Sequence, residues 1–407
     1  MRIIGSGCAL AGALALALGA TGAGAAQAQG APPIRIAVET DMSGVLSALS
    51  GPTSLRAVQM AVDDAGGSVL GRKIEVVAID HRNNAGEGAA KAREFWAQGG
   101  DLIVDLTNSG VAIAVETVGR ELHKLALVTG GYSSDITGKF CSKYTYQYDA
   151  NSYSLAHATG ANLASQPGGK RWYIIYADYA FGHAMLNDFT HAIVAHGGEI
   201  LRSDAVPLGT TDFSAYLLAA RAAHPQVIAT MNTGADLINV MKQIREFGLD
   251  RDAKISIGLL SQAEVNALPD LFAGVRVTVP WFWNQDRAAI AWTDRLAKYT
   301  GTAVRPTEVH AGDYSAVSQW LAAVKATGTT DADTIVAYLD GRKVDDFYVH
   351  GGEWRARDHQ MVHAMEVVDV VGASAAKIPG ANFQLVETIP ADRSFPAPAD
   401  SVCQKTW

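Results

Sequence analysis

Polar side chains follow two neighbouring apolar runs of the sequence, at the points where each run ends. Thr107-Asn108-Ser109-Gly110 comes after the run at 102–106, and a segment rich in hydroxyls and glycine, 129–135, comes after the run at 125–128. A hydroxyl or amide beside the free N–H groups at a helix start suits a carboxylate or another anion. The alternative for Asn108 and Ser109 is a helix cap alone. Two adjacent turns of this kind favour a shared anion pocket.

Aromatic residues stand at the corresponding places in the middle of the chain. The segment 176–182 contains Tyr176, Tyr179 and Phe181, and Trp281-Phe282-Trp283 follows Pro280. Packing in a core or at a hinge is the alternative interpretation. An apolar wall that faces an anion-binding wall is what a small organic ligand needs.

Motifs for catalysis are absent from the sequence. It contains no G-x-S-x-G elbow, no phosphate-binding G-x-x-x-x-G-K-S/T loop, no H-E-x-x-H and no dinucleotide fingerprint at a strand-to-helix junction. His359 and His363 are four residues apart, but the residues around them alternate as in a strand, so we interpret both as surface or loop-end histidines rather than metal ligands. We predict no cofactor and no metal.

The elements that position these side chains alternate regularly. The patterns predict strands at 34–38, 74–79, 102–106, 125–128, 172–176, 198–203 and 227–230, and helices at 52–65, 86–97, 111–123, 154–164, 184–196, 213–223 and 237–247. This alternation is typical of parallel sheets with helices on both faces, here as two α/β units in series. The remaining pieces, at 277–280, 288–299, 314–326 and 361–371, are too few for a third domain, so we expect them to complete both units.

Composition narrows the class of protein. The chain has 407 residues, of which 48% are hydrophobic and 18% charged, with a net charge of −8. Such a chain is too apolar for disorder and long enough for about two domains. The acidic balance without a basic block excludes a nucleic-acid partner held by its phosphates.

The first 28 residues resemble a cleavable secretory signal. Arg2 precedes a short apolar run at 10–18, and Ala26-Gln27-Ala28 is a small-x-small cleavage signal. A membrane anchor is the alternative, but the run is interrupted by Gly19, Gly22 and Gly24 before it reaches the length of a span. We predict a signal peptide at 1–28 and an exported mature chain that does not insert into a membrane.

After cleavage, the mature chain keeps Cys141 and Cys403. An isolated pair in an oxidising compartment is more often a disulfide than a catalytic thiol, so we predict that the pair pins the tail 391–407 to the first half of the chain. The alternative is two buried free thiols.

Six segments of the sequence together resemble a known family. They are Asp41-Met42-Ser43-Gly44, 69–75 (VLGRKIE), 178–182 (DYAFG), 209–213 (GTTDF), 246–249 (EFGL) and 310–314 (HAGDY). In this order they resemble the type I periplasmic solute-binding proteins of ABC importers, of the leucine/isoleucine/valine-binding kind. The resemblance implies two doubly wound parallel-sheet lobes, joined by a three-strand hinge, that close on a ligand like a Venus flytrap.

The resemblance also implies how the chain is divided and with what it works. Lobe 1 would comprise 29–150 and about 282–350, and lobe 2 would comprise 151–281 and about 351–390. A monomer in the periplasm would bind a small molecule and deliver it to the permease and ATPase subunits of an importer. It would not be an enzyme.

The family's ligand-binding positions fall on particular residues here. Ser109, Tyr132 and Ser133 would hold a ligand carboxylate, Phe181 and Trp283 the apolar part, and Asn108, Asn232 and Thr233 lie at polar turns beside the cleft. Amino-acid binders place an acidic residue after the strand near 257, where this chain has Gly258-Leu259-Leu260-Ser261. Asp236 or Asp313 are the candidate replacements. Because an unpaired ammonium in a closed cleft is unfavourable, we favour an uncharged-tail or aromatic carboxylate over an α-amino acid.

Two other functions remain open at this point. One is the ligand-sensing module of a signalling system with the same fold. The other is an exported hydrolase in which Ser109 is activated by a histidine.

Overall fold

The structure of the protein is a computed structural model that describes residues 31–303, 305–405 and 407. The predicted signal peptide at 1–28 lies outside these residues. Residues 32–407 form one compact unit. Within the described part of the chain, no helix combines the length and apolarity that crossing a membrane requires.

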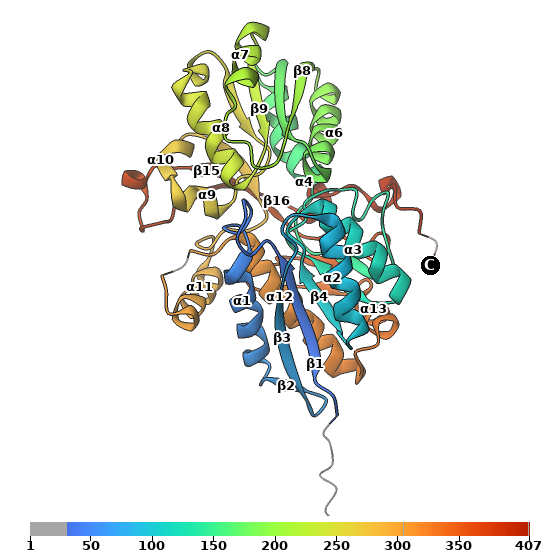
Figure 1. The fold of residues 1–407 in the computed structure, drawn as a ribbon. Helices are drawn as coiled ribbons and strands as arrows, with labels where there is room; N and C mark the ends of the chain where they lie inside the picture. Colours follow the sequence, from blue (N-terminus) through green and yellow to red (C-terminus); the bar gives the residue numbers. More distant parts are fainter. Residues whose placement is uncertain (1–30, 304, 406) are drawn as a thin grey trace, which may run out of the picture. The chain divides into compact units, whose positions relative to one another are not determined.

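The first lobe is built on a six-stranded sheet with the order β2-β3-β1-β4-β5-β6 (Figure 1). Its strands are β1 (Ile34–Thr40), β2 (Ser68–Val69), β3 (Arg72–Asp80), β4 (Leu102–Asp105), β5 (Leu125–Val128) and β6 (Thr145–Gln147). All neighbours are parallel except β2 and β3, which form a hairpin. The parallel strands place their carboxyl ends at one edge of the sheet, and the two predicted turns follow β4 and β5 at this edge.

Helices cover both faces of this sheet because successive strand residues point to opposite sides. Ile36 and Val38 pack in one cluster with α1 (Gly51–Asp64), α11 (Arg287–Thr300), α12 (Glu308–Thr327) and α13 (Ala332–Leu339). Ala37 and Ile103 pack in another with α2 (Ala85–Ala97) and α3 (Ser109–Leu122).

The second lobe repeats this plan around a four-stranded parallel sheet with the order β10-β9-β7-β8. Its strands are β7 (Arg171–Ala177), β8 (Glu199–Val206), β9 (Val227–Met231) and β10 (Lys254–Ile257). One face packs on α4 (Ser152–Leu155), a π-helical turn (Ala156–Gly160), α5 (Ala161–Ser165) and α6 (Ala180–Ala195), and the other on α7 (Ser214–Ala223) and α8 (Gly234–Glu246). The short helices α9 (Gln262–Ala267) and α10 (Pro269–Phe272) follow β10. The predicted α/β class with two parallel-sheet lobes is confirmed.

The chain crosses between the lobes three times. Tyr148 packs in the core of the first lobe and Ala150 in the core of the second. The chain returns between Val279, which packs in the second lobe, and Trp281, which packs in the first. The third change lies between Met361 and Met365. No single cut in the sequence therefore separates the two lobes.

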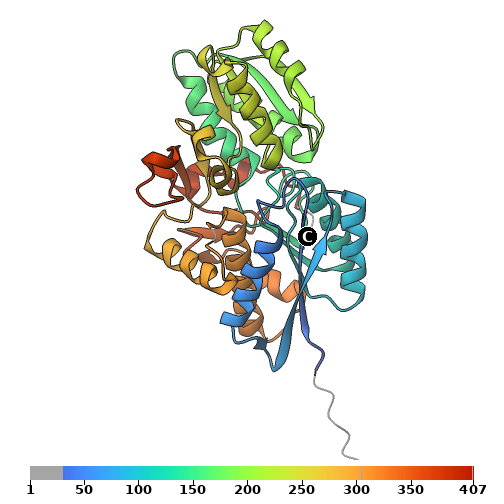
Figure 2. The ribbon, with the colours of Figure 1, turned by 60° about the vertical axis from the view of Figure 1, so that its left-hand side comes forward.

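The last third of the chain forms two small antiparallel sheets. The first has the order β11-β15-β16, with β11 (Arg276–Val279), β15 (Met365–Val370) and β16 (Phe383–Ile389), and the second has the order β12-β13-β14, with β12 (Lys343–Val344), β13 (Gly352–Trp354) and β14 (Met361–Val362). In Figures 1 and 2 the red C-terminal segment lies where the two lobes meet.

The lobe boundaries expected from the resemblance stay a prediction, and several residues pack differently from them. Phe282, at the expected start of the second part of lobe 1, packs in the core of the second lobe. The expected second lobe starts again at about 351, whereas Trp354 and Met361 pack in the core of the first lobe. The rings of Trp354 and Tyr146 pack edge to face, with their centroids 4.9 Å apart. The two residues are far apart in the sequence, so a local sequence pattern does not predict this contact.

A disulfide joins Cys141 and Cys403, with an S–S distance of 2.07 Å, which confirms the predicted pair. The tail also contains α14 (Ala391–Ser394) and Phe395, which packs in the second lobe's core. The tail therefore contacts both lobes.

Of the two interpretations of His359 and His363, the surface position is wrong and the loop-end position is confirmed, because both residues lie in loops next to β14. Both are fully buried. His359 stacks on Tyr146 at 4.0 Å and faces Asp340, and burial lowers the pKa of His363 to about 4, which keeps it neutral. Packing against aromatic rings stabilises the two histidines in the core despite their polar ring nitrogens.

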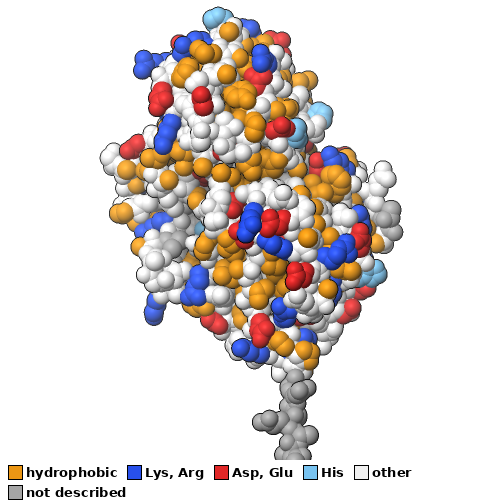
Figure 3. Space-filling view, viewed as in Figure 1, with side chains coloured by type: hydrophobic (Ala, Val, Ile, Leu, Met, Phe, Trp, Pro, Cys, Tyr) orange, Lys and Arg blue, Asp and Glu red, His pale blue; other side chains and the backbone are white. Residues whose placement is uncertain are grey.

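On the face of the molecule that Figure 3 shows, acidic and basic side chains are interspersed.

Candidate ligand-binding site

The turn after β4 combines backbone strain with a helix cap. Asp105 and Leu106 have φ angles of +87° and +58°, which non-glycine residues rarely adopt. Asn108 then caps α3, because its side-chain oxygen accepts hydrogen bonds from the N–H groups of Gly110 (3.0 Å) and Val111 (3.3 Å). The capping role of Asn108 is therefore real, and it places Ser109 as the first residue of α3.

The turn after β5 lies directly against the first turn. The N–H of Ser133 donates to the hydroxyl oxygen of Ser109 at 3.1 Å. A Cβ at Gly130 would lie 1.9 Å from the hydroxyl oxygen of Thr107, so only glycine allows this approach. The two turns that the sequence predicts to share a pocket are in contact.

The second lobe supplies the opposite wall. Phe181 lies in the first turn of α6, Thr233 precedes α8, and Leu259 follows β10. Together with the first lobe they enclose one small cavity, which is lined by Leu46, Leu49, Thr107, Asn108, Ser109, Gly130, Tyr132, Tyr179, Phe181, Thr233 and Leu259. Its volume is about 10 Å³, room for at most about one water molecule. The two walls are closed on each other.

Five of the predicted site residues therefore line one cavity, namely Asn108, Ser109, Tyr132, Phe181 and Thr233. Ser133 joins them through its hydrogen bond to Ser109. Sequence reasoning missed Leu46 and Leu49, and it named Tyr179 and Leu259 only within the segments 176–182 and 258–261, without selecting them as site residues. Tyr179 immediately precedes α6, as Asn108 immediately precedes α3. The argument that selected Asn108, a side chain at the start of a helix after a strand, therefore also applies to Tyr179.

The structure does not place the other four predicted residues on this cavity. Asn232 accepts a hydrogen bond from the Thr230 hydroxyl at 3.0 Å, and Asp236 accepts one from the N–H of Gly209 at 2.8 Å. Trp283 donates to the carbonyl of Gly380 at 3.0 Å, and Asp313 accepts from the hydroxyl of Thr129. Contact of these four with a ligand stays a prediction, without support from the closed arrangement.

Three helices begin at the cavity. Ser109 starts α3, Tyr179 and Thr233 immediately precede α6 and α8, and these helices have 14, 16 and 13 residues. The N-terminus of a helix carries partial positive charge. Side chains already bond the first N–H groups of α3 and α8, since Asn108 accepts from Gly110 and Val111 and Glu264 accepts from Gly234. Because the three N-termini come from both lobes, their partial charges suit an anion at the closed cavity.

Tyr132 turns its hydroxyl away from the cavity and into a buried acidic cluster. Its hydroxyl donates to Asp149 at 3.0 Å and lies 3.3 Å from Glu308, whose other oxygen accepts from the Ser261 hydroxyl at 3.1 Å. Glu264 accepts from the N–H groups of Gly234 and Ser261. Glu308 and Ser261 belong to different lobes, so this cluster ties them together behind the cavity.

Burial determines the charge state of this cluster. It raises the pKa of Asp149 to about 7 and that of Glu308 to about 8, and nearby Asp149 also raises the pKa of Glu308. The pKa of Glu264 is raised by burial as well. Sequence reasoning missed this cluster, although Ser261 and Glu264 have the spacing of a capping box.

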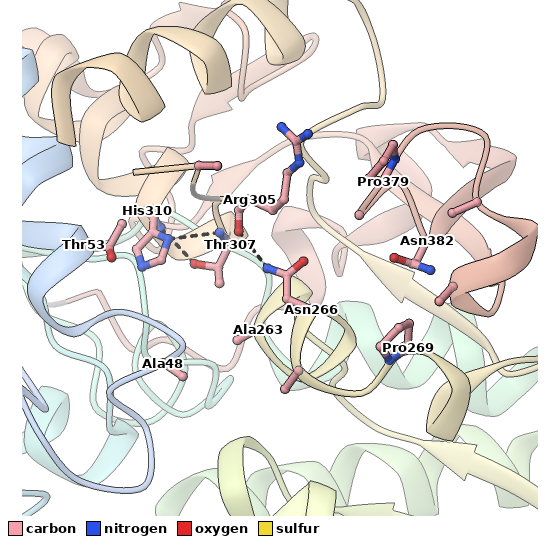
Figure 4. A pocket seen from close by; sticks show the side chains of 15 residues that line it. Ala48, Thr53, Ala263, Asn266, Pro269, Arg305, Thr307, His310, Pro379 and Asn382 are labelled. Atoms are coloured by element: carbon pink, nitrogen blue, oxygen red, sulfur yellow. Dashed lines mark hydrogen bonds between the residues drawn. The ribbon is translucent and has the colours of Figure 1, made fainter. Parts of the chain in front are cut away.

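A larger hollow lies beside the closed cavity (Figure 4). It has a volume of about 850 Å³ and is lined by small residues such as Ala48 and Ala263, with Asn266 and Arg305. The guanidinium of Arg305 lies 4.1 Å from the centre of the Trp283 ring, and Asn266 donates to the carbonyl of Arg305. None of the predicted site residues lines this hollow.

Comparison with known proteins identifies the family. The family model described as "Periplasmic binding protein" matches residues 33–376. A curated relative, the Leu/Ile/Val-binding protein homolog 4 of Brucella abortus, is 25% identical over 287 residues, which covers 67% of this chain and 68% of the relative.

Two solved structures agree with this result. A periplasmic binding protein from Burkholderia mallei is 36% identical, covers 91% of this chain and 98% of its own, and has a TM-score of 0.88. A solute-binding protein of an ABC transporter from Rhodopseudomonas palustris, solved with 3,4-dihydroxybenzoic acid, has a TM-score of 0.79. It is 21% identical, covers 88% of this chain and 98% of its own, and so shows the fold alone.

Proposed function

This chain belongs to the periplasmic binding protein family, and we propose that it captures a small organic carboxylate between its lobes and delivers it to the permease of an ABC importer. One observation carries the proposal. Three helix N-termini from both lobes meet at a cavity that contains the hydroxyl of Ser109 and the aromatic ring of Phe181. Such a site offers an anion-binding end and an apolar end.

The carboxylate would bind at the first-lobe turns. Ser109 has a hydroxyl proton that it does not donate to a described residue, while its oxygen accepts from the N–H of Ser133. The N-terminus of α3 adds partial positive charge at the same place. Ser109 and Ser133 would therefore fix the anionic end of the ligand.

The rest of the ligand would be apolar or aromatic. The second end of the cavity is formed by Tyr179, Phe181 and Leu259, with Leu46 and Leu49 from the first lobe. No Asp, Glu, Lys or Arg is found among the described residues that line it. An α-ammonium group would lack a charged partner there, which favours a carboxylate without an amino group.

Two relatives support different ligand classes. The 3,4-dihydroxybenzoic acid bound to the Rhodopseudomonas palustris protein supports an aromatic carboxylate. The name of the Brucella abortus relative supports a branched-chain amino acid, which is the alternative ligand. The absence of a charged lining residue decides our preference for the carboxylate.

Binding would work by a shift between open and closed arrangements. A ligand that contacts Ser109 in one lobe and Phe181 in the other gains both contacts only in the closed arrangement. Its differential affinity therefore moves the equilibrium towards closure. The cavity of about 10 Å³ would have to widen to admit even a small acid.

The proposal can be tested with a thermal-shift panel on the mature protein, refolded to remove any copurified ligand. The panel contains benzoate, 4-hydroxybenzoate, 3,4-dihydroxybenzoate, aliphatic carboxylates and leucine, isoleucine and valine. We expect carboxylates without an amino group to raise Tm. Stabilisation by the amino acids alone would contradict the proposed ligand class, and stabilisation by neither group would contradict the proposed function.

Delivery to a permease needs a separate test. We expect the loaded protein to stimulate the ATPase activity of a cognate importer in proteoliposomes. Stimulation of a sensor kinase and not of an importer would favour the signalling alternative.

A further inference from the structure

We propose that Asp313 is a positioning residue of the binding site, which shares one proton with Asp105 and so holds the two ligand-facing turns together. The inference rests on the proposed function, because these turns carry Ser109 and Ser133. Asp313 does not line the cavity, so it acts through the turns and not by contact with a ligand.

Each carboxyl group binds one of the two turns. Asp105 accepts a hydrogen bond from the N–H of Thr107 at 2.9 Å and another from the Thr107 hydroxyl, both at Oδ1. Asp313, on α12, accepts from the hydroxyl of Thr129 at its own Oδ1. The backbone carbonyl of Asp105 also accepts from the N–H groups of Thr129 (3.1 Å) and Gly130 (3.0 Å). The pair therefore links β4, β5 and α12.

The remaining oxygens of the pair lack donors. Asp105 Oδ2 and Asp313 Oδ2 are both buried, and neither accepts a hydrogen bond from any residue that the structure describes. Neither side chain has exposed surface, and both residues bond Thr129, Asp105 through its backbone carbonyl and Asp313 through its carboxyl group. Two bare carboxylates cannot stay together in such a place, whereas one proton between the two oxygens forms a strong O–H···O⁻ bond and removes one charge.

Ser54 and Thr40 place uncharged hydroxyls near the pair, and the charged and titratable groups nearby do not neutralise it. Glu39 at the end of β1 is acidic, and burial raises its pKa to about 8. Lys91 of α2 donates to Glu87 and to the backbone of Asp80. The histidines on this side, His81 after β3 and His310 on α12, have pKa values lowered by burial to about 4 and stay neutral.

The titration of the pair agrees with this geometry. Burial raises the pKa of Asp105 to about 6 and raises that of Asp313 well above its ordinary value, and the nearby Asp105 adds to the second shift. Ser54 of α1 borders both carboxyl groups and contributes a hydroxyl without charge. The pair therefore holds one proton near neutral pH.

The first turn needs such a restraint. Asp105 and Leu106 both have left-handed backbone angles, which are unfavourable for residues other than glycine. A carboxyl group that binds the next residue and faces a second element keeps the turn in this conformation. If the pair loses its proton or one partner, we expect the strained turn to relax and Ser109 to separate from Ser133.

Amide hydrogen exchange of the mature protein without added ligand tests this inference. Peptides that cover 105–111 and 129–134 report on the two turns, at about pH 7 and about pH 9, after correction for intrinsic exchange rates. The variants are Asp313→Asn, which keeps a donor without titrating, and Asp313→Ala, which removes the bridge. Glu116→Gln is the control, because Glu116 is a buried carboxyl of α3 with both oxygens unpaired and its pKa raised by burial, away from the turns.

We expect the unsubstituted protein to exchange at both turns about tenfold faster at the higher pH, and Asp313→Asn to reduce this difference at 105–111. At 129–134 part of the difference should remain, because Tyr132 bonds Asp149 and Glu308, which titrate in the same pH range. Asp313→Ala should exchange rapidly at both pH values, and Glu116→Gln should match the unsubstituted protein. Equal exchange in Asp313→Ala and the unsubstituted protein, or rapid exchange of Asp313→Asn at the lower pH, would overturn the inference. If Asp313→Ala does not fold, the pH dependence and Asp313→Asn decide. Because no ligand is added, failure of the proposed function leaves these outcomes unchanged.

Discussion

The hydroxyl oxygen of Ser109 accepts a hydrogen bond from the backbone N–H of Ser133 at 3.1 Å, and this bond joins the turns that follow two adjacent strands. Ser109 starts α3, so the same hydroxyl stands at the positive end of a helix. Its proton is available to a ligand while its oxygen holds the neighbouring turn. This double role makes Ser109 the residue on which the anionic end of the site depends.

Replacement of Ser109 tests that role. Ser109→Ala removes a donor to a charged group, a bond that contributes about 1.5–3 kcal/mol, so we expect Kd for 4-hydroxybenzoate to rise about tenfold or more. Isothermal titration calorimetry measures the change. Ser318→Ala is the matched control, because that hydroxyl donates to the carbonyl of Tyr314 within α12, away from the cavity. An unchanged Kd in Ser109→Ala would contradict the assigned role.

The aromatic wall gives a second prediction. Phe181 is buried and lines the cavity from the second lobe. Phe181→Ala enlarges the cavity and removes the contact with the ligand that stabilises the closed arrangement. Affinity for benzoates should therefore fall about tenfold or more. Phe140→Ala, at an exposed phenylalanine of the first lobe, should leave affinity unchanged. Equal loss in both variants would show that the effect is not specific to the cavity.

The buried acids behind Tyr132 predict how stability depends on pH. Asp149 and Glu308 have folded-state pKa values of about 7 and about 8, above their values in an unfolded chain. A raised pKa means that the folded state binds more protons than the unfolded state. The contribution of these two groups to the free energy of unfolding is therefore greatest below about pH 4 and falls as pH rises to about 8. Urea unfolding at a series of pH values should show this decline.

A variant separates Glu308 from the other acids. In Glu308→Gln the decline of unfolding free energy between about pH 4 and about pH 8 should be shallower, because one titrating group is gone. Glu246→Gln, at an exposed glutamate of α8, should keep the original slope. Identical slopes in all three proteins would contradict the protonated state of Glu308.

The disulfide gives a prediction about stability alone. Cys141 and Cys403 close a loop with a sequence separation of 262. Chain entropy assigns such a link about 5 kcal/mol at most, so the double variant Cys141→Ser, Cys403→Ser should unfold at lower denaturant concentration. Mass analysis of the non-reduced protein should also show one disulfide. An unchanged unfolding midpoint would mean that the tail stays in place without the link.

The elements and the first-lobe turns could be predicted from the sequence because local pattern determines them. Strand 125–128 was predicted at its observed bounds, and Ser109 and Phe181 follow strands whose ends are visible as breaks in apolar runs. Helix α12 begins at Glu308 rather than at 314, because the residues of its first turns do not form an apolar stripe. The cap by Thr307, which accepts from the N–H of His310, was the signal for the earlier start.

Other parts of the site depend on contacts between distant segments. Tyr132 meets Glu308, and Asp313 meets Thr129, only after the chain has crossed to the second lobe and returned. No spacing in the sequence relates these residues. Contact of Asp313 with a ligand stays a prediction from the sequence, and the supporting role that we propose for it rests on its hydrogen bond with Thr129.

The central claim is that a carboxylate binds in the closed cavity at Ser109. A crystal structure of the refolded protein with the most stabilising carboxylate of the panel tests it most directly. The account predicts the carboxylate oxygens within hydrogen-bond distance of the Ser109 hydroxyl and the apolar part against Phe181. A carboxylate bound instead to Arg305 in the larger hollow, with the cavity at Ser109 still closed, would contradict it.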